Sequence, residues 1–211
     1  HFLPIPPPVI TGTLGAFIRI RQTIPTKRIL FDIGLAGPVA GFAILVPALF
    51  FGLSLSRVVP LPDDINGFAL GDPLLFRFAA WVTFGTVPNG YTLNLHPMAF
   101  AAWFGLFATA LNLLPIGQLD GGHIAYATLG RHSTAVTVIS VIVVMSLSTY
   151  SPTWILWSVL MLIMLLIIGP RHPRTIDHHI PLDPTRTLIA VGALIMLVVC
   201  FTPAPITLIG E

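Results

Sequence analysis

The residue of this chain best placed to do chemistry is an aspartate inside an apolar stretch. Asp120 follows Pro115 and Gly117, and it is followed directly by Gly121 and Gly122. Because proline and glycine disfavour a continuous helix, we expect this carboxylate to lie at a helix break. An ionisable side chain at membrane depth costs about 2.5–3.5 kcal/mol on insertion scales, and a bound cation would offset that cost. Catalytic zinc often takes two histidines and one carboxylate, and it activates water at neutral pH.

The sequence also allows a purely structural role for this carboxylate. Asp120 can accept a hydrogen bond from the amide of Gly122 or His123 and so cap the helix that follows. Partner ligands are not evident, because the 7 histidines form no His-Glu-x-x-His pair and Glu211 is the only glutamate in the chain. His123, three residues after Asp120, is either an outer contact of the metal site or an interfacial residue, and we favour the second interpretation. Both interpretations of Asp120 stay open from these residues.

The composition is that of a membrane protein. Hydrophobic residues make up 55% of the 211 positions and charged residues 9%, whereas soluble domains carry about 25% charged residues. Lys and Arg number 10 against 8 Asp and Glu, and the net charge of +2 is too small for a nucleic-acid-binding surface. Cys200 is the only cysteine, so the chain can form no disulfide within itself.

The apolar segments predict an all-α polytopic membrane protein with about five transmembrane helices. The expected spans are Ile33 to Leu55, Pro97 to Leu114, Ala135 to Leu147, Trp154 to Ile168 and Leu188 to Phe201. A short helix should run from Asp120 to Leu129. Alternation of period two over Thr13 to Arg21 predicts a short membrane-associated β-strand near the N-terminus, where Gly12 and Gly15 allow another backbone to approach closely.

This pattern divides the chain into three regions. Residues 1–32 are expected to form a Pro-rich loop, an edge strand and a basic turn, residues 33–130 the membrane core, and residues 131–211 the C-terminal transmembrane helices. Gly37 and Gly41 lie four residues apart in the first span and should let another helix pack closely. All Lys and Arg residues except Arg57 and Arg77 fall on one side of this arrangement, which we assign to the cytoplasm.

Three motifs resemble those of the site-2 protease family of intramembrane zinc metallopeptidases. The segments Leu111–Pro115 (LNLLP) and Leu119–His123 (LDGGH) resemble the second signature of this family. The segment Ala36–Phe42 (AGPVAGF) is similar to its Ala-Gly-Pro-x-Ala-Gly helix start. The segments 2–6 (FLPIP) and 12–17 (GTLGAF) resemble the loop and strand that follow its first catalytic helix, particularly in bacterial and plastid members without an inserted PDZ domain.

The resemblance implies a zinc endopeptidase that cleaves membrane-embedded peptide segments. It implies that Asp120 is the third zinc ligand and that Asn112 and Pro115, with Gly121 of the same motif, shape the helix break near the substrate. In this family the His-Glu-x-x-His helix precedes the Pro-rich loop. We therefore interpret the sequence as part of a longer protein whose remaining zinc ligands and catalytic base lie outside it.

The resemblance also gives the N-terminal strand a role. Its edge, with Gly12 and Gly15, would form backbone hydrogen bonds to an unwound transmembrane segment of a substrate protein. The expected partners are this segment and the lipid bilayer, with no nucleic acid, and the sequence predicts no oligomeric state.

Two other function classes stay open. Secondary transporters also build ion sites from a broken helix, here one with Asp120 and Asn112. A catalytically inactive membrane scaffold related to the protease would share the same motifs. The expected location is the plasma membrane of a bacterium, with a plastid membrane as the alternative.

Overall fold

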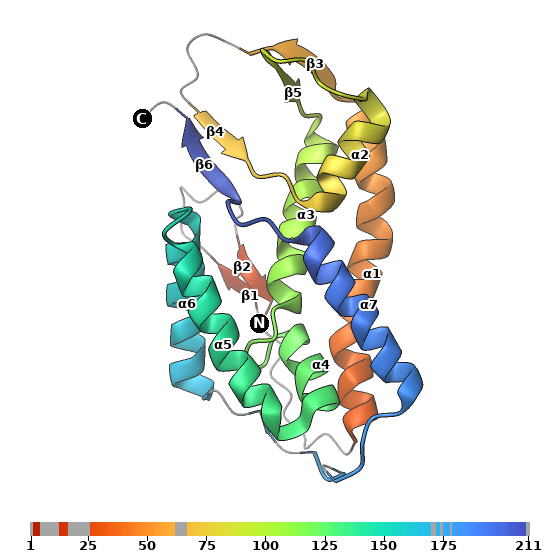
Figure 1. The fold of residues 1–211 in the computed structure, drawn as a ribbon, viewed down its shortest axis with the longest axis vertical. Coiled ribbons are helices and arrows are strands. Elements are labelled where there is room, and N and C mark those ends of the chain that lie inside the picture. Colours follow the sequence, from red (N-terminus) through yellow and green to blue (C-terminus); the bar gives the residue numbers. More distant parts are fainter. Residues whose placement is uncertain are drawn as a thin grey trace.

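The computed structural model describes residues 2–4, 13–16, 26–61, 67–169, 172–173, 175–177 and 179–209. Within these ranges the helices are α1 (Lys27–Ser54), α2 (Leu74–Phe84), α3 (Pro97–Leu113), α4 (Asp120–Leu129), α5 (Ser133–Leu147), α6 (Thr153–Ile168) and α7 (Pro184–Cys200), with a short 3-10 turn η1 (Gly130–His132). The strands are β1 (Phe2–Pro4), β2 (Thr13–Ala16), β3 (Arg57–Pro60), β4 (Gly67–Leu70), β5 (Tyr91–Asn94) and β6 (Ile206–Ile209). The predicted mostly helical architecture is confirmed (Figure 1).

Two helical stretches are long and apolar enough to cross a membrane, judged by length and composition. They are Lys27–Ser54, which is α1, and Asp120–Leu147, which comprises α4, η1 and α5. Gly130, with a φ of 57°, ends α4, and α5 leaves this turn in a different direction (Figure 1). The helices α2, α3, α6 and α7 are apolar but shorter. The expected five spans therefore remain a prediction.

Helix α1 begins earlier than the sequence predicts. The Thr26 side chain accepts a hydrogen bond from the amide of Ile29 over 3.2 Å and caps the helix, as threonine commonly does. Lys27 and Arg28 therefore form the first turn of α1 rather than the expected basic turn. Further along, α1 packs against α3 at Gly52, where a Cβ atom would overlap the backbone of α3.

Two sheets that the sequence did not predict cover one end of the helices. Strands β3 and β5 pair antiparallel, and so do β4 and β6 (Figure 1). Buried indoles connect the second sheet to the helices: Trp103 donates from Nε1 to the carbonyl of Gly71 over 2.7 Å, and Trp154 donates to that of Pro203 over 2.7 Å. The segment between α1 and α3 is thus more regular than a connecting loop.

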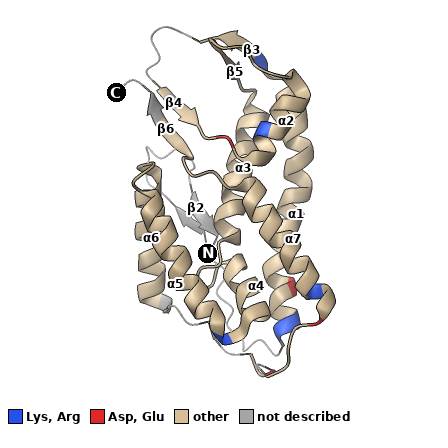
Figure 2. Ribbon diagram, in the orientation of Figure 1, with Lys and Arg blue, Asp and Glu red and all other residues tan. Residues whose placement is uncertain are grey.

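The described Lys and Arg residues lie at the two ends of the molecule. Arg57 lies in β3 and Arg77 in α2, at the end covered by the sheets (Figure 2). Lys27, Arg28 and Arg186 lie in the first turns of α1 and α7, and those turns are at the opposite end (Figure 2). This separation agrees with the charge bias expected from the sequence.

Candidate metal centre

The predicted helix break lies between α3 and α4. Leu114 leaves the helical conformation, with φ −56° and ψ 130°, and Gly117 has a φ of 54°, which favours glycine. The amide of Leu119 donates to the carbonyl of Ile116 over 3.1 Å, and α4 then begins at Asp120. The break lies in the middle part of the fold (Figure 1).

Two glycines allow α4 to begin against the end of α3. A Cβ atom at Gly121 would overlap the carbonyl group of Leu113, and one at Gly122 would overlap that of Gly117. Neither Gly121 nor Gly122 has a positive φ. Other residues could adopt the backbone conformation at both positions. Glycine is required there because a larger side chain would have no space.

The Asp120 side chain has no hydrogen-bond or ion-pair partner among the described residues. It is partly buried. Leu119 is the capping residue of α4 and makes no side-chain cap, and the amide of His123 donates to the Leu119 carbonyl over 3.0 Å. The interpretation of Asp120 as a helix cap is therefore wrong. The carboxylate lies at a helix N-terminus, where negative charge is favoured, and it stays available for another ligand.

Helix α1 lies beside this carboxylate. A Cβ atom at Gly34 would lie 2.9 Å from both the carbonyl oxygen of Asp120 and the Cβ of His123, so Gly34 lets α1 and α4 touch. Gly37 is exposed, and a Cβ atom there would lie 3.5 Å from Oδ2 of Asp120. No atom of the described residues lies within 4 Å of such an atom at Gly41. Among the described residues, α4 therefore contacts the face of Gly37 and Gly41 through Asp120 at Gly37, and no helix contacts it at Gly41.

Asn112 and Pro115 both lie at the break, as the sequence predicts. The Asn112 side chain is exposed and makes no hydrogen bond to the described residues, so it does not link those helices. Pro115 is partly buried, and its carbonyl oxygen accepts a hydrogen bond from Oγ1 of Thr137 over 3.2 Å. Helix α5 therefore contacts the break directly.

The predicted N-terminal strand is confirmed over Thr13–Ala16, which is β2 and contains Gly15. It pairs antiparallel with β1, a segment expected to be loop. Among the described strands β2 has this one neighbour. Gly12 lies outside the described residues.

A pair of histidines that the sequence analysis did not connect lies next to the break. His123 is 6% exposed, and its Nδ1 is 2.7 Å from Nε2 of His172. Nδ1 of His172 is 2.7 Å from the carbonyl oxygen of Pro173. Because a carbonyl can only accept, His172 donates from Nδ1, and its Nε2 accepts from Nδ1 of His123. His123 is therefore buried within the protein and contacts the loop that follows α6. Desolvation lowers the pKa of His172, partly countered by the bond to Pro173.

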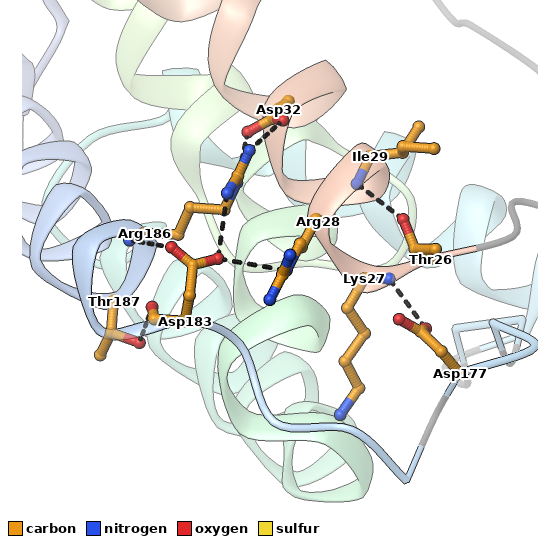
Figure 3. A network of polar contacts seen from close by, with 9 residues as sticks. All are labelled: Thr26, Lys27, Arg28, Ile29, Asp32, Asp177, Asp183, Arg186 and Thr187. Atoms are coloured by element: carbon orange, nitrogen blue, oxygen red, sulfur yellow. Dashed lines mark hydrogen bonds and ion pairs between the residues drawn. The ribbon is translucent and has the colours of Figure 1, made fainter.

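The loop between α6 and α7 carries His172 and is anchored at two further points. The His172 ring stacks on Tyr126 of α4 with ring centroids 4.4 Å apart, and the Tyr126 hydroxyl accepts from the amide of Thr175 over 3.3 Å. The Asp177 carboxylate accepts from the amide of Lys27 over 2.9 Å (Figure 3). No spacing in the sequence could reveal these contacts, since their partners are distant along the chain.

An ion-pair network joins the first turns of α1 and α7. Arg186 donates from Nε and one terminal nitrogen to the two carboxylate oxygens of Asp32, both over 2.8 Å. Its other terminal nitrogen lies 3.0 Å from Asp183, and Nε of Arg28 lies 3.5 Å from the same carboxylate (Figure 3). These aspartates are therefore engaged, in contrast to Asp120.

The described residues include no group of three or more His, Cys, Asp or Glu side chains that could hold a metal ion. His96 instead caps α3, where its Nδ1 accepts a hydrogen bond from the amide of Met98 over 3.2 Å. A carboxylate without a partner suits one position of a zinc site. The donor set of the described residues thus fits one ligand of such a site.

Comparison with known proteins identifies the family of this chain. Residues 8–150 match the model of Peptidase family M50. The probable zinc metalloprotease EGY1, chloroplastic, of Arabidopsis thaliana is 31% identical over 165 residues, which are 74% of this chain and 30% of that protein. The probable zinc metalloprotease EGY2, chloroplastic, of the same plant is 28% identical over 202 residues, which are 95% of this chain and 36% of that protein.

Another relative carries a different name. The DDT domain-containing protein PTM of Arabidopsis thaliana is 31% identical over 163 residues, which are 74% of this chain and 9% of that protein. No solved structure matches the chain significantly. The chain spans about a third of the length of the two metalloprotease relatives. Because the names of these relatives state a chloroplast location, the comparisons give the expected bacterial plasma membrane no support. With residues 8–150 matched, the chain belongs to peptidase family M50, in agreement with its resemblance to the site-2 proteases.

Proposed function

We propose that the intact protein is an intramembrane zinc metalloendopeptidase and that Asp120 is one of its zinc ligands. The observation that carries this proposal is the Asp120 carboxylate, which is partly buried at the start of α4 without a partner among the described residues. Its support from relatives is the named activity of the metalloproteases that the chain resembles.

When bound, zinc supplies Lewis-acid activation of water and of the scissile carbonyl. The role of Asp120 is to present a negatively charged oxygen at a fixed place. The break provides that place, because Gly121 and Gly122 hold the first turn of α4 against the backbone before it. Gly34 adds a close contact from α1 on the other side.

We propose that the remaining zinc ligands belong to a helix outside the described residues that packs on the open face of α1. This face consists of Ala36, Gly37, Ala40 and Gly41, all of which are exposed. Small residues let two helix backbones approach closely, and the face is continuous with the site because Gly37 lies next to Oδ2 of Asp120. A helix seated here would bring its own side chains to the carboxylate.

We propose a transmembrane segment of another protein as the substrate, cleaved in regulated intramembrane proteolysis. The substrate helix must unwind to expose its peptide bonds. Strand β2, which contains Gly15, has one neighbour among the described strands, and its other edge suits pairing with the substrate. The exposed Asn112 side chain is available for polar contact with the unwound backbone. The expected five membrane spans, in a multi-pass integral membrane protein, are part of this proposal.

The test is the zinc content of the purified intact protein. Asp120→Asn keeps the shape of the side chain and removes its charge, and it should lower bound zinc and abolish cleavage of a transmembrane reporter. Asp72→Asn is the matched control, because Asp72 lies in the turn before α2, at the end covered by the sheets. Unchanged zinc content in Asp120→Asn would refute the assignment.

A second candidate is a membrane scaffold without protease activity. The sequence leaves it open, because an inactive relative of the protease would share the same motifs. Such a protein would cleave no transmembrane reporter under conditions in which a zinc-loaded protease does. No observation on the described residues favours the transporter alternative.

A further inference from the structure

Helix α5 contributes one side chain to the helix break that precedes Asp120. Thr137 is 4% exposed. Its hydroxyl accepts a hydrogen bond from the amide of Gly117 over 3.3 Å and donates one to the carbonyl of Pro115 over 3.2 Å. One hydroxyl therefore holds two backbone groups of the break, on either side of Ile116.

Thr137 does not form the bond within its own helix that Thr83, Thr109 and Thr128 form. A helical threonine often donates to a carbonyl of its own helix, and Thr109 does so to Gly105 over 2.8 Å. The hydroxyl of Thr137 instead reaches a neighbouring segment. Gly117 needs such a partner because it is buried, and its φ of 54° takes its amide out of any helical pattern.

The geometry points to Thr137 as a positioning residue of the metal centre. Its hydrogen bonds go to the Pro115–Gly117 backbone and not to Asp120, and this backbone leads within three residues to Asp120. By fixing that backbone, Thr137 holds the start of α4 and hence the direction of the carboxylate. This inference rests on the proposed zinc site.

The experiment uses the full-length protein with Zn²⁺ and with Co²⁺ as a spectroscopic probe. Thr137→Val keeps the shape of the side chain and removes both hydrogen bonds, whereas Thr137→Ser keeps the hydroxyl. Losing an outer contact of a metal ligand typically weakens metal binding by about 10–100-fold. We expect Thr137→Val to weaken Zn²⁺ binding by about tenfold and to change the Co²⁺ absorption spectrum, and we expect Thr137→Ser to restore both.

Thr109→Val is the matched control, because it removes a buried hydroxyl that bonds within its own helix. It should leave Zn²⁺ affinity and the Co²⁺ spectrum unchanged. Wild-type Zn²⁺ binding in Thr137→Val would overturn the inference, and so would an equal loss in Thr137→Ser, which would indicate packing alone. If Thr137→Val does not fold, hydrogen exchange of the Gly117 amide in the unmodified protein decides: protection is expected, and rapid exchange would overturn the inference.

The same measurements separate this inference from the proposed function. If Asp120→Asn retains its zinc, the zinc site itself is wrongly assigned. If Asp120→Asn loses zinc while Thr137→Val binds it normally, the zinc site stands and the role of Thr137 is refuted.

Discussion

Replacing Gly121 with alanine tests whether tight packing shapes the break before Asp120. Inside a helix, alanine is more favourable than glycine by about 0.8–1.0 kcal/mol, and Gly121 has no positive φ that alanine would strain. Local preference alone therefore predicts that Gly121→Ala stabilises the protein. The surroundings predict the opposite, because the new Cβ atom would overlap the carbonyl group of Leu113.

The size of the loss in stability depends on which atom the new Cβ would overlap. Overpacking costs about 1–3 kcal/mol, and the upper end applies because a backbone carbonyl cannot rotate away as a side chain does. Subtracting the helix preference leaves a net loss of about 2 kcal/mol in the free energy of unfolding. For a chain of this size that loss lowers Tm by about 4–8 °C.

The assay is thermal unfolding of the intact protein in detergent micelles, with Gly192→Ala as the matched control. Gly192 lies in α7, and no described atom lies within 4 Å of a Cβ atom placed there. This substitution should raise the free energy of unfolding by up to about 1 kcal/mol. If both substitutions shift Tm upward by similar amounts, the close approach of α4 to the end of α3 is not a constraint and the reasoning fails.

Three further predictions concern contacts outside the break. Arg186→Lys loses the paired contact with Asp32, so Tm should fall slightly at low salt and by less at high salt; an equal fall at both would contradict an electrostatic origin. Trp103→Phe removes the hydrogen bond to the carbonyl of Gly71 and should cost about 0.5–1.5 kcal/mol, measured by unfolding, and an unchanged Tm would show that the bond adds no stability. The pKa of His172 lies below its ordinary value of 6.5 in the folded protein, so the undocked loop binds a proton first and docking weakens as pH falls below 6.5. His172 contacts His123 and Tyr126. The protection of amides in the loop between α6 and α7, measured relative to their intrinsic exchange rates, should therefore fall at low pH, and His172→Gln should remove this pH dependence.

The parts of the fold that the sequence predicts are those that depend on neighbouring residues. Proline and glycine on both sides of Asp120 indicated the break, and the apolar runs indicated the helices, because both signals act over a few positions. The strand at Thr13–Ala16 followed from an alternating pattern in the same way. Local chemistry was sufficient for each of these elements.

The parts that the sequence does not predict depend on residues far apart along the chain. Strand β6 pairs with β4, which lies far from it along the chain. No pattern among neighbouring residues indicates such a pairing. The pairing of His123 with His172 joins α4 to a loop 49 residues away, and the contact of Thr137 with the break spans 20 residues. The face of Gly37 and Gly41 suggested helix packing, but composition cannot show which glycines of a helix meet a neighbour.

Asp120 differs from the other described aspartates in lacking a partner, which favours a bound cation. Those have a counterpart: Asp32 and Asp183 bind arginine, Asp177 accepts from an amide, and Asp72 lies in the field of Arg77. A charge at membrane depth costs about 2.5–3.5 kcal/mol, and the N-terminus of α4 offsets about 0.3–1 kcal/mol of it. Protonation would remove the charge but add an O–H group that has no acceptor among the residues described here. A divalent cation satisfies both the charge and the oxygen lone pairs, so the zinc content of Asp120→Asn distinguishes a bound metal from a neutral acid.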